Sequence, residues 1–226
     1  MKLLLIALVV GALVAAFGFR LGQQDHSLRL PTPETPKGAK VLVLGGGCFW
    51  CLDSLYSELK GVLQVESGYA GGSRSGVTYE QVCSGVTGHA EVVRVVYDPK
   101  EVSGEDLLRI FFAVHDPTTL DRQGPDSGTQ YRSAIFYSND EEKAMAEKIK
   151  AEIAKEKIWD DPIVTTIEPL KNYTRAEEYH QDYFAKYEKA TPAERMSMNA
   201  GYCNAIIAPK VAKFRAHYAA KLKKGG

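Results

Sequence analysis

The stretch Gly45–Cys51 constrains the fold of this chain most, because it joins an expected strand to an expected helix. The apolar run Val41–Leu44 precedes it and predicts a buried strand. Three glycines then permit a tight backbone turn, and the apolar residues of Cys48–Leu59 recur at helical spacing. We therefore expect Cys48 at a helix N-terminus, where unpaired N–H groups and the helix dipole favour a thiolate.

Further strands and helices alternate along the chain without strict βαβ regularity, which predicts an α+β fold with a mixed sheet flanked by helices. The expected strands cover residues 62–69, 91–97, 133–137 and 163–168, and the expected helices cover residues 79–82, 104–115, 140–157, 175–187 and 209–222. Two long loops, residues 71–88 and 116–129, are rich in polar and aromatic side chains. Loops held by a rigid scaffold often carry chemistry, so we expect the partners of Cys48 there.

The N-terminus has an export pattern. A basic start precedes Leu3–Phe19, a run without a charged residue, and Arg20 follows. Such a pattern is typical of a secretory signal. As a helix it would reach about 25 Å, which is marginal for a membrane span. The segment is therefore interpreted as a signal peptide or a retained membrane anchor, with a buried core helix as the weaker alternative.

This pattern divides the chain into three parts. Residues 1–20 are the signal peptide or anchor, residues 21–39 form a polar, proline-containing linker, and residues 40–226 form one globular domain. We expect an exported protein, periplasmic or membrane-anchored, that faces outside the cytoplasm.

Charge and cysteine spacing narrow the possible functions. Lys+Arg and Asp+Glu both number 28, so bulk charge does not indicate nucleic-acid binding. Cys48 and Cys51 form one C-x-x-C pair, whereas Cys83 and Cys203 stand alone. One pair does not complete a four-cysteine zinc site, and no histidine pair has ligand spacing, so we expect no metal. Cys83 is interpreted as a packed thiol.

Six ordered sequence blocks resemble peptide-methionine sulfoxide reductase A, in its GCFWC-type branch. They are GCFWC at 47–51, SGYAGG at 67–72, SGVTGHAEVV at 84–93, HDPTT at 115–119, RQGPDSGTQYRS at 122–133 and EYHQDY at 178–183. A lone C-x-x-C would be weak support, but six blocks in order are specific. The resemblance implies a ferredoxin-like two-layer core and reduction of methionine S-sulfoxide, free or in proteins, with no cofactor beyond an external thioredoxin-like thiol reductant.

The resemblance also implies roles for individual residues. It makes Cys48 the nucleophile and Glu91 the acid. The substrate-binding residues that it implies are Phe49, Trp50, Tyr79, Asp126 and Tyr131. His89 and His180 are interpreted as structural, bracing neighbouring backbone and loops.

These residue types suit the chemistry. A sulfoxide sulfur becomes a good electrophile only when its oxygen is protonated or strongly hydrogen-bonded. Cys48 can then attack sulfur while a protonated Glu91 donates to the departing oxygen. Burial would raise the pKa of Glu91 and keep it a donor near neutral pH. The product is a sulfenic acid on Cys48, which a resolving thiol converts to a disulfide.

The sequence departs from the commonest family pattern at two positions. Asp53 replaces a glutamate, and Cys51 replaces a glycine. Cys51 is a candidate resolving cysteine, and Cys203 in the C-terminal Gly-Tyr-Cys segment is the other. We favour attack by Cys51 first, with Cys203 relaying the disulfide outward, and keep both candidates open.

Two rival functions would account for part of the sequence. A thioredoxin-like disulfide oxidoreductase would use the C-x-x-C pair, but it leaves Glu91 unexplained and the sequence offers no persuasive cis-proline loop. A tethered binding domain would hold methionine or its sulfoxide in the aromatic pocket without turnover.

Overall fold

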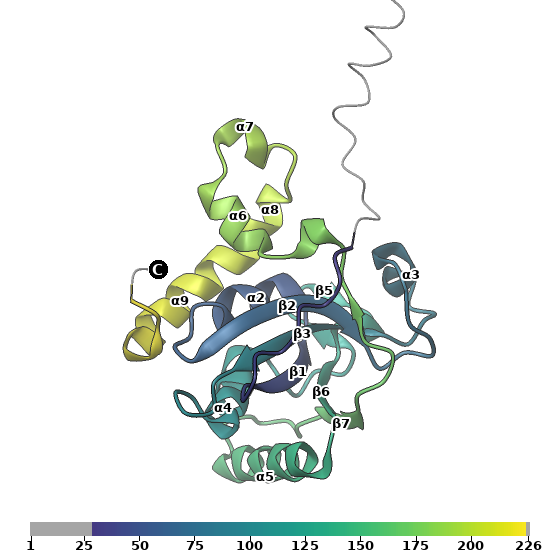
Figure 1. Ribbon diagram of the computed structural model, residues 1–226, viewed down its shortest axis with the longest axis vertical. Coiled ribbons are helices and arrows are strands. Elements are labelled where there is room, and N and C mark those ends of the chain that lie inside the picture. Colours follow the sequence, from purple (N-terminus) through teal and green to yellow (C-terminus); the bar gives the residue numbers. More distant parts are fainter. Residues whose placement is uncertain (1–28, 225–226) are drawn as a thin grey trace, which may run out of the picture.

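A six-stranded mixed sheet with helices packed against one main face organises residues 29–224, which are the residues that the computed structural model describes (Figure 1). This confirms the expected fold class. No helix within residues 29–224 is long and apolar enough to cross a membrane. The apolar run Leu3–Phe19 lies outside the described residues.

The sheet has the order β7-β6-β1-β3-β2-β8, with β1 and β3 at its centre. Its neighbours pair antiparallel except β6 and β7, which are parallel. The strands are β1 (Lys40–Gly46), β2 (Val62–Ala70), β3 (Ala90–Tyr97), β6 (Ser133–Tyr137), β7 (Thr166–Pro169) and β8 (Thr174–Arg175). A separate two-stranded hairpin joins β4 (Arg122–Gln123) to β5 (Asp126–Ser127).

The helices were largely expected from the sequence. They are α2 (Phe49–Tyr56), α3 (Tyr79–Cys83), α4 (Gly104–Val114), α5 (Asp140–Glu156), α6 (Tyr183–Lys189), α7 (Pro192–Arg195), α8 (Ala200–Tyr202) and α9 (Ala208–Tyr218). Short 3₁₀ turns cover η1 (Thr129–Tyr131), η2 (Glu178–His180) and η4 (Ala219–Lys221), and a π turn covers η3 (Cys203–Ile207). Side chains of Ser103 and Asn139 cap α4 and α5.

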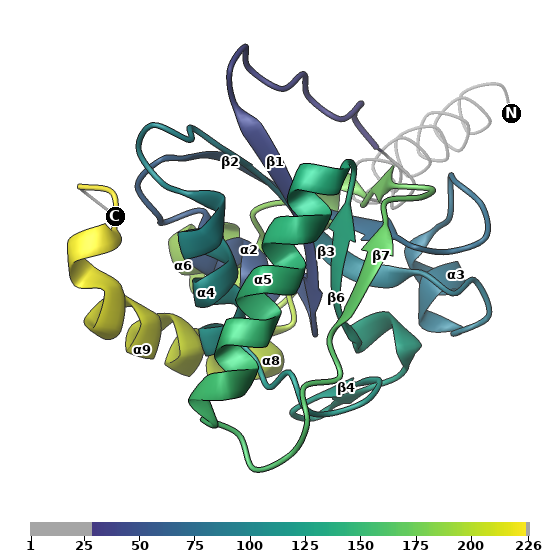
Figure 2. The ribbon, with the colours of Figure 1, turned by 90° about the horizontal axis from the view of Figure 1, so that it is seen from below.

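Alternation along the strands separates two cores. Leu42 and Leu44 of β1 belong to the large core that α2, α4, α5 and α9 cover, whereas Val43 faces a small cluster on the opposite side. Figure 2 shows α4 and α5 lying together across the sheet. On β3, Glu91 lies on the same face of the sheet as Val93, which belongs to the large core. The Glu91 carboxyl group accepts a hydrogen bond from the first amide of α2.

The expected helix at residues 175–187 is wrong in its first half. Arg175 pairs with Gly68 as part of β8, and only a 3₁₀ turn follows before α6. The Gln181 side chain accepts from the Ser67 amide at 2.9 Å and donates to the Ser67 and Ala176 carbonyls at 3.0 Å. Asp182 then has φ of 50°. Sheet pairing and this left-handed residue override the local helical periodicity.

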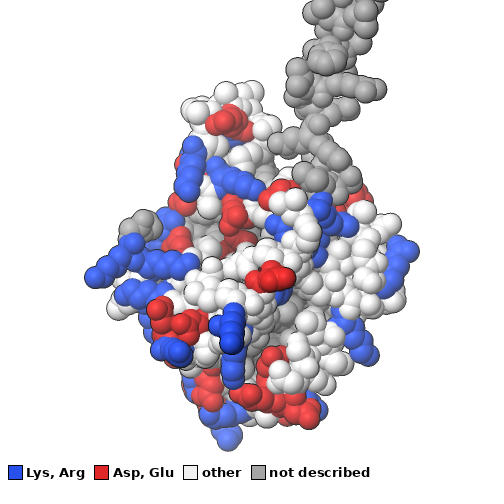
Figure 3. All heavy atoms as spheres, in the orientation of Figure 1, with Lys and Arg blue, Asp and Glu red and all other residues white. Residues whose placement is uncertain are grey.

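Acidic and basic side chains are interspersed on the face drawn in Figure 3. This face shows no broad region of one sign, which agrees with the balanced composition.

His115 links the end of α4 to β6 through a neutral ring. Its Nδ1–H donates to the Phe111 carbonyl at 2.6 Å, and its Nε2 accepts from the Ser133 hydroxyl at 2.7 Å. Burial lowers the pKa of His115 to about 4.

We expect His115 to make the protein acid-sensitive. The unfolded histidine gains a proton near pH 6.5 and the folded one only near pH 4, so stability falls as pH decreases through this window, by at most about 1.4 kcal/mol per pH unit. Denaturant unfolding of the wild type and His115→Asn between pH 7 and 4 measures this. In His115→Asn the free energy of unfolding should fall less steeply as pH decreases from 6.5 to 4. In the control His217→Asn, at an exposed histidine, it should fall as steeply as in the wild type. Equal slopes in all three proteins would contradict the assignment.

Candidate active site

A glycine turn fixes the start of α2. Gly47 has φ of +88°, and a Cβ there would lie 2.5 Å from Cγ of Gln123, so glycine is required on both counts. The turn leaves Cys48 as the residue that precedes α2, in the N-cap position. The sequence-based prediction of Cys48 at a helix N-terminus is therefore confirmed.

The first amide of α2 binds Glu91. The Phe49 N–H donates to Oε2 of Glu91 at 3.0 Å, and Glu91 itself is 2% exposed. Burial raises the pKa of Glu91 to about 8, more than this hydrogen bond lowers it. Glu91 is therefore mostly a neutral acid at pH 7 and can donate a proton from its carboxyl group, as the sequence predicted.

The two thiols of the C-x-x-C pair are buried and hydrogen-bonded to each other. Burial raises the pKa of Cys48 well above that of a free thiol, which corrects the expectation of a thiolate there. The physical reason is that the Phe49 N–H donates to the Glu91 carboxyl, and the Cys48 side chain accepts no capping hydrogen bond. A Cys48 thiolate therefore lacks the stabilisation expected at a helix N-terminus. The hydrogen bond from Cys48 lowers the pKa of Cys51 to about 7. In this arrangement Cys51 is the better thiolate.

Aromatic rings line up beside these thiols. Trp50 stacks on Tyr183 with ring centres 3.8 Å apart and planes 7° apart. Phe49 and Tyr79 both pack against the His180 ring, at 4.9 and 4.6 Å between centres. His180 thus braces two of the expected substrate-binding residues, although it lies on a 3₁₀ turn rather than on the expected helix.

Both expected substrate tyrosines come close to Glu91. Tyr79 at the start of α3 and Tyr131 at the end of η1 are partly buried, and the nearby Glu91 carboxyl adds to the effect of burial in raising the pKa of each phenol. Tyr131 also lies near Cys48. Residues from two loops and one strand therefore meet at the start of α2.

The C-terminal segment closes over the same place. The Tyr202 hydroxyl donates to Oδ2 of Asp126 at 2.6 Å and lies within hydrogen-bonding reach of the Cys48 and Cys51 thiols. Asp126, implied from the sequence as a substrate-binding residue, therefore contacts Tyr202 of the C-terminal segment. Cys203 follows Tyr202, is fully buried, and has Cys51 as its thiol neighbour.

Three other residues singled out from the sequence, Cys83, His89 and Asp53, lie near the site residues. Cys83 is exposed, because the neighbouring Val82 takes the inward position of α3, so its interpretation as a packed thiol is wrong. His89 is buried against Gly72, where a Cβ would lie 2.0 Å from its ring. Asp53 is buried and accepts a long hydrogen bond of 3.4 Å from the Ser67 hydroxyl. Burial raises the pKa of Asp53 to about 7.

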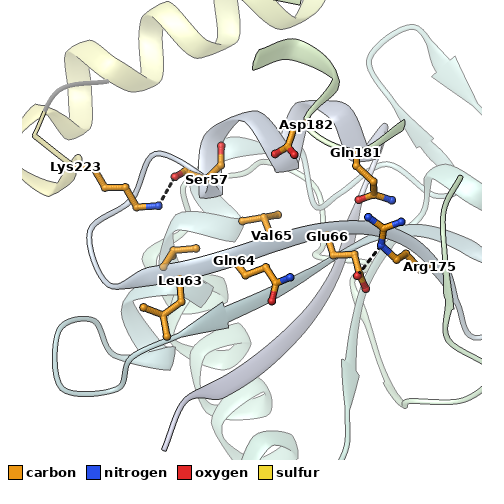
Figure 4. A pocket seen from close by; sticks show the side chains of 10 residues that line it. Ser57, Leu63, Gln64, Val65, Glu66, Arg175, Gln181, Asp182 and Lys223 are labelled. Carbon is orange, nitrogen blue, oxygen red and sulfur yellow. Dashed lines mark hydrogen bonds and ion pairs between the residues drawn. The ribbon is translucent and has the colours of Figure 1, made fainter. Parts of the chain in front are cut away.

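A separate polar cavity of about 330 Å³ lies beside the far end of α2 (Figure 4). Two of the charged side chains that line it, Arg175 and Glu66, are paired with each other, since Arg175 donates to Glu66 at 2.9 Å. It contains none of the expected site residues. Among residues 29–224, no group of three His, Cys, Asp or Glu side chains is arranged to hold a metal ion.

Comparison with known proteins agrees with this geometry. The family model described as peptide methionine sulfoxide reductase matches residues 40–222. This chain belongs to that family. The MsrA enzyme of Polynucleobacter asymbioticus is 50% identical over 175 residues, which is 77% of this chain and 87% of the relative. MsrA 1 of Rhodopirellula baltica is 47% identical over 193 residues, covering 85% and 94%.

Solved structures show the same fold. Reduced Mxr1 from Saccharomyces cerevisiae aligns with a TM-score of 0.63 at 39% identity and covers 70% of this chain and 91% of its own. Methionine sulfoxide reductase A of Corynebacterium diphtheriae aligns with a TM-score of 0.61 at 33% identity, covering 75% and 88%. The chain is therefore a thiol-dependent methionine sulfoxide reductase.

The buried Glu91 should make stability fall as pH rises. Unfolded glutamate loses its proton near pH 4.5 and folded Glu91 near pH 8, so the native state binds more protons between these values and loses stability through that window. Glu91→Gln should therefore gain stability over the wild type as pH rises from 4.5 to 8 and keep a constant difference above pH 8. Thermal unfolding across pH 4.5–9 tests this, with exposed Glu147→Gln as the control. A constant difference across the whole range would contradict it.

Proposed function

We propose that Cys48 attacks the sulfur of methionine S-sulfoxide while Glu91 protonates the sulfoxide oxygen. The supporting observation is the neutral carboxyl of Glu91, buried beside the residue that starts α2. The thiol and the sulfoxide yield a sulfenic acid and a sulfide, so the Cys48 sulfur loses two electrons and the substrate sulfur gains them. The thiol proton replaces the one that Glu91 donates.

Substrate binding uses the residues around these two groups. Tyr79 and Tyr131 flank Glu91 and donate to the sulfoxide oxygen as negative charge develops there. The Phe49 and Trp50 rings contact the substrate methyl group. Asp126 acts through Tyr202, from whose hydroxyl it accepts a hydrogen bond.

Regeneration runs through Cys51 and then Cys203. Cys51, with its pKa of about 7, attacks the Cys48 sulfenic acid, forms the Cys48–Cys51 disulfide and releases water. Cys203 has Cys51 as its thiol neighbour and attacks the Cys51 sulfur, which frees Cys48. An external dithiol of the thioredoxin class then reduces the Cys51–Cys203 disulfide and is itself oxidised.

The proposed location is outside the cytoplasm, where the protein repairs oxidised envelope proteins. The support is the basic start and uncharged run Leu3–Phe19. If this run stays in the membrane, the roughly ten residues between Phe19 and Arg29 reach at most about 35 Å, which keeps the domain close to the bilayer. Recovery of the protein only from the cytosol of its native host would refute this location.

Turnover of separate sulfoxide epimers tests the reaction. With dithiothreitol present, we expect methionine from the S epimer and none from the R epimer. Cys48→Ser removes the nucleophile and should abolish turnover, whereas Ser138→Ala, at an exposed serine before α5, should keep it. No turnover of either epimer by the wild type refutes the proposal, and bound sulfoxide without turnover favours the binding-domain alternative.

The order of the resolving cysteines is tested by one turnover without reductant. In Cys203→Ser we expect a Cys48–Cys51 disulfide in peptide mass mapping, because Cys51 already contacts Cys48. In the matched Cys51→Ser variant the sulfenic acid should persist longer. Accumulation of sulfenic acid in Cys203→Ser without the Cys48–Cys51 disulfide would show that Cys51 is not the first resolving thiol.

A further inference from the structure

Arg29, a residue of the linker, reaches into the domain beside the substrate site. Its Nη2 donates to the Val77 carbonyl at 2.6 Å and to Oε1 of Glu177. The Arg29 side chain is 21% exposed and that of Glu177 is 2% exposed. Within residues 29–224, this is the one ion pair that Glu177 makes. Arg29 also lies outside residues 40–222, the segment that the family model matches.

Glu177 holds two tyrosines that lie near Glu91. Its Oε1 accepts the Tyr79 amide at 3.1 Å, and its Oε2 accepts the Tyr69 hydroxyl at 2.8 Å. Tyr69 stands directly opposite Glu91 in the β2–β3 ladder. The Tyr69 hydroxyl is therefore committed to Glu177, while the Tyr79 backbone is fixed at the first residue of α3.

Arg29 joins two segments that are distant in sequence. Two hydrogen bonds join the segment 76–79, which leads into α3, to residues 174–177. The Gly76 amide donates to the Thr174 hydroxyl at 2.9 Å, and the Tyr79 amide donates to Glu177. Arg29 bonds to both sides of this junction. Removing its charge would leave a buried carboxylate without a cation, a costly state that the site can relieve only by moving or admitting water.

We propose that Arg29 is a positioning residue of the substrate site, which acts through Glu177 to fix the Tyr79 backbone. The linker is then part of the working enzyme, and a domain that begins at Lys40 lacks this support. The inference rests on the proposed role of Tyr79 in binding the sulfoxide. Arg29 itself touches neither Cys48 nor Glu91 and takes no chemical step.

The test uses the full chain and three variants. Arg29→Gln removes the charge, and Arg29→Lys restores a cation that can donate to both acceptors. Arg109→Gln is the matched control, because it breaks another arginine–glutamate pair, to Glu152, that joins α4 to α5. Two quantities are measured: hydrogen exchange of the Tyr79 amide by NMR, and kcat/KM for a peptide containing methionine S-sulfoxide.

In Arg29→Gln we expect Tyr79 amide exchange to accelerate about tenfold and kcat/KM to fall about tenfold. Arg29→Lys should stay within about threefold of the wild type in both quantities, and Arg109→Gln should match the wild type. Arg29→Gln should unfold at a lower temperature than Arg109→Gln, because its ion pair is the more buried of the two. Both quantities are therefore measured well below the two unfolding temperatures, where each variant is folded, so that general destabilisation does not explain the loss.

Wild-type kcat/KM in Arg29→Gln overturns the proposal, even where amide exchange accelerates. An equal loss in Arg29→Lys also overturns it, because the cation would then be irrelevant. A wild type without turnover refutes the proposed function instead, and in that case unchanged Tyr79 exchange in Arg29→Gln still overturns the positioning role.

Discussion

The hydrogen bond from the Phe49 amide to Glu91 connects the first turn of α2 to the central strand β3, and the rest of the site depends on it. It holds a carboxyl group in the large core, where burial outweighs the bond and keeps the group protonated near neutral pH. It also occupies the N–H at the start of the helix. The same bond that places the acid therefore withholds stabilisation from a Cys48 thiolate.

Much of the fold follows from local sequence patterns. The valine-rich run at residues 91–97 predicted β3, and the triple glycine predicted the turn into α2. Each of these depends on residues within a few positions of one another. The acid role of Glu91 came from the family resemblance, and its raised pKa followed from the expected burial of its strand.

The parts that the sequence did not reveal depend on contacts across long separations. The Gln181 side chain binds the backbone of Ser67 in β2, 114 positions away, and this contact replaces the helix that the neighbouring residues favour. Tyr183 stacks on Trp50, and Tyr202 reaches Asp126, so two aromatic members of the site come from the C-terminal third of the chain. The available signals were that Tyr183 ends the EYHQDY block and that Tyr202 precedes the candidate resolving residue Cys203.

The surroundings of the three buried thiols support the order of redox steps proposed above. The hydrogen bond from Cys48 lowers the pKa of Cys51, whereas burial raises the pKa of Cys203. Because the thiolate is the nucleophile, Cys51 can react while the site stays closed. In the proposed cycle Cys203 becomes the better nucleophile once its segment leaves the core, a movement that would also carry Tyr202 away from Asp126. Opening of the C-terminal segment would therefore clear the site and expose the outgoing disulfide in one motion.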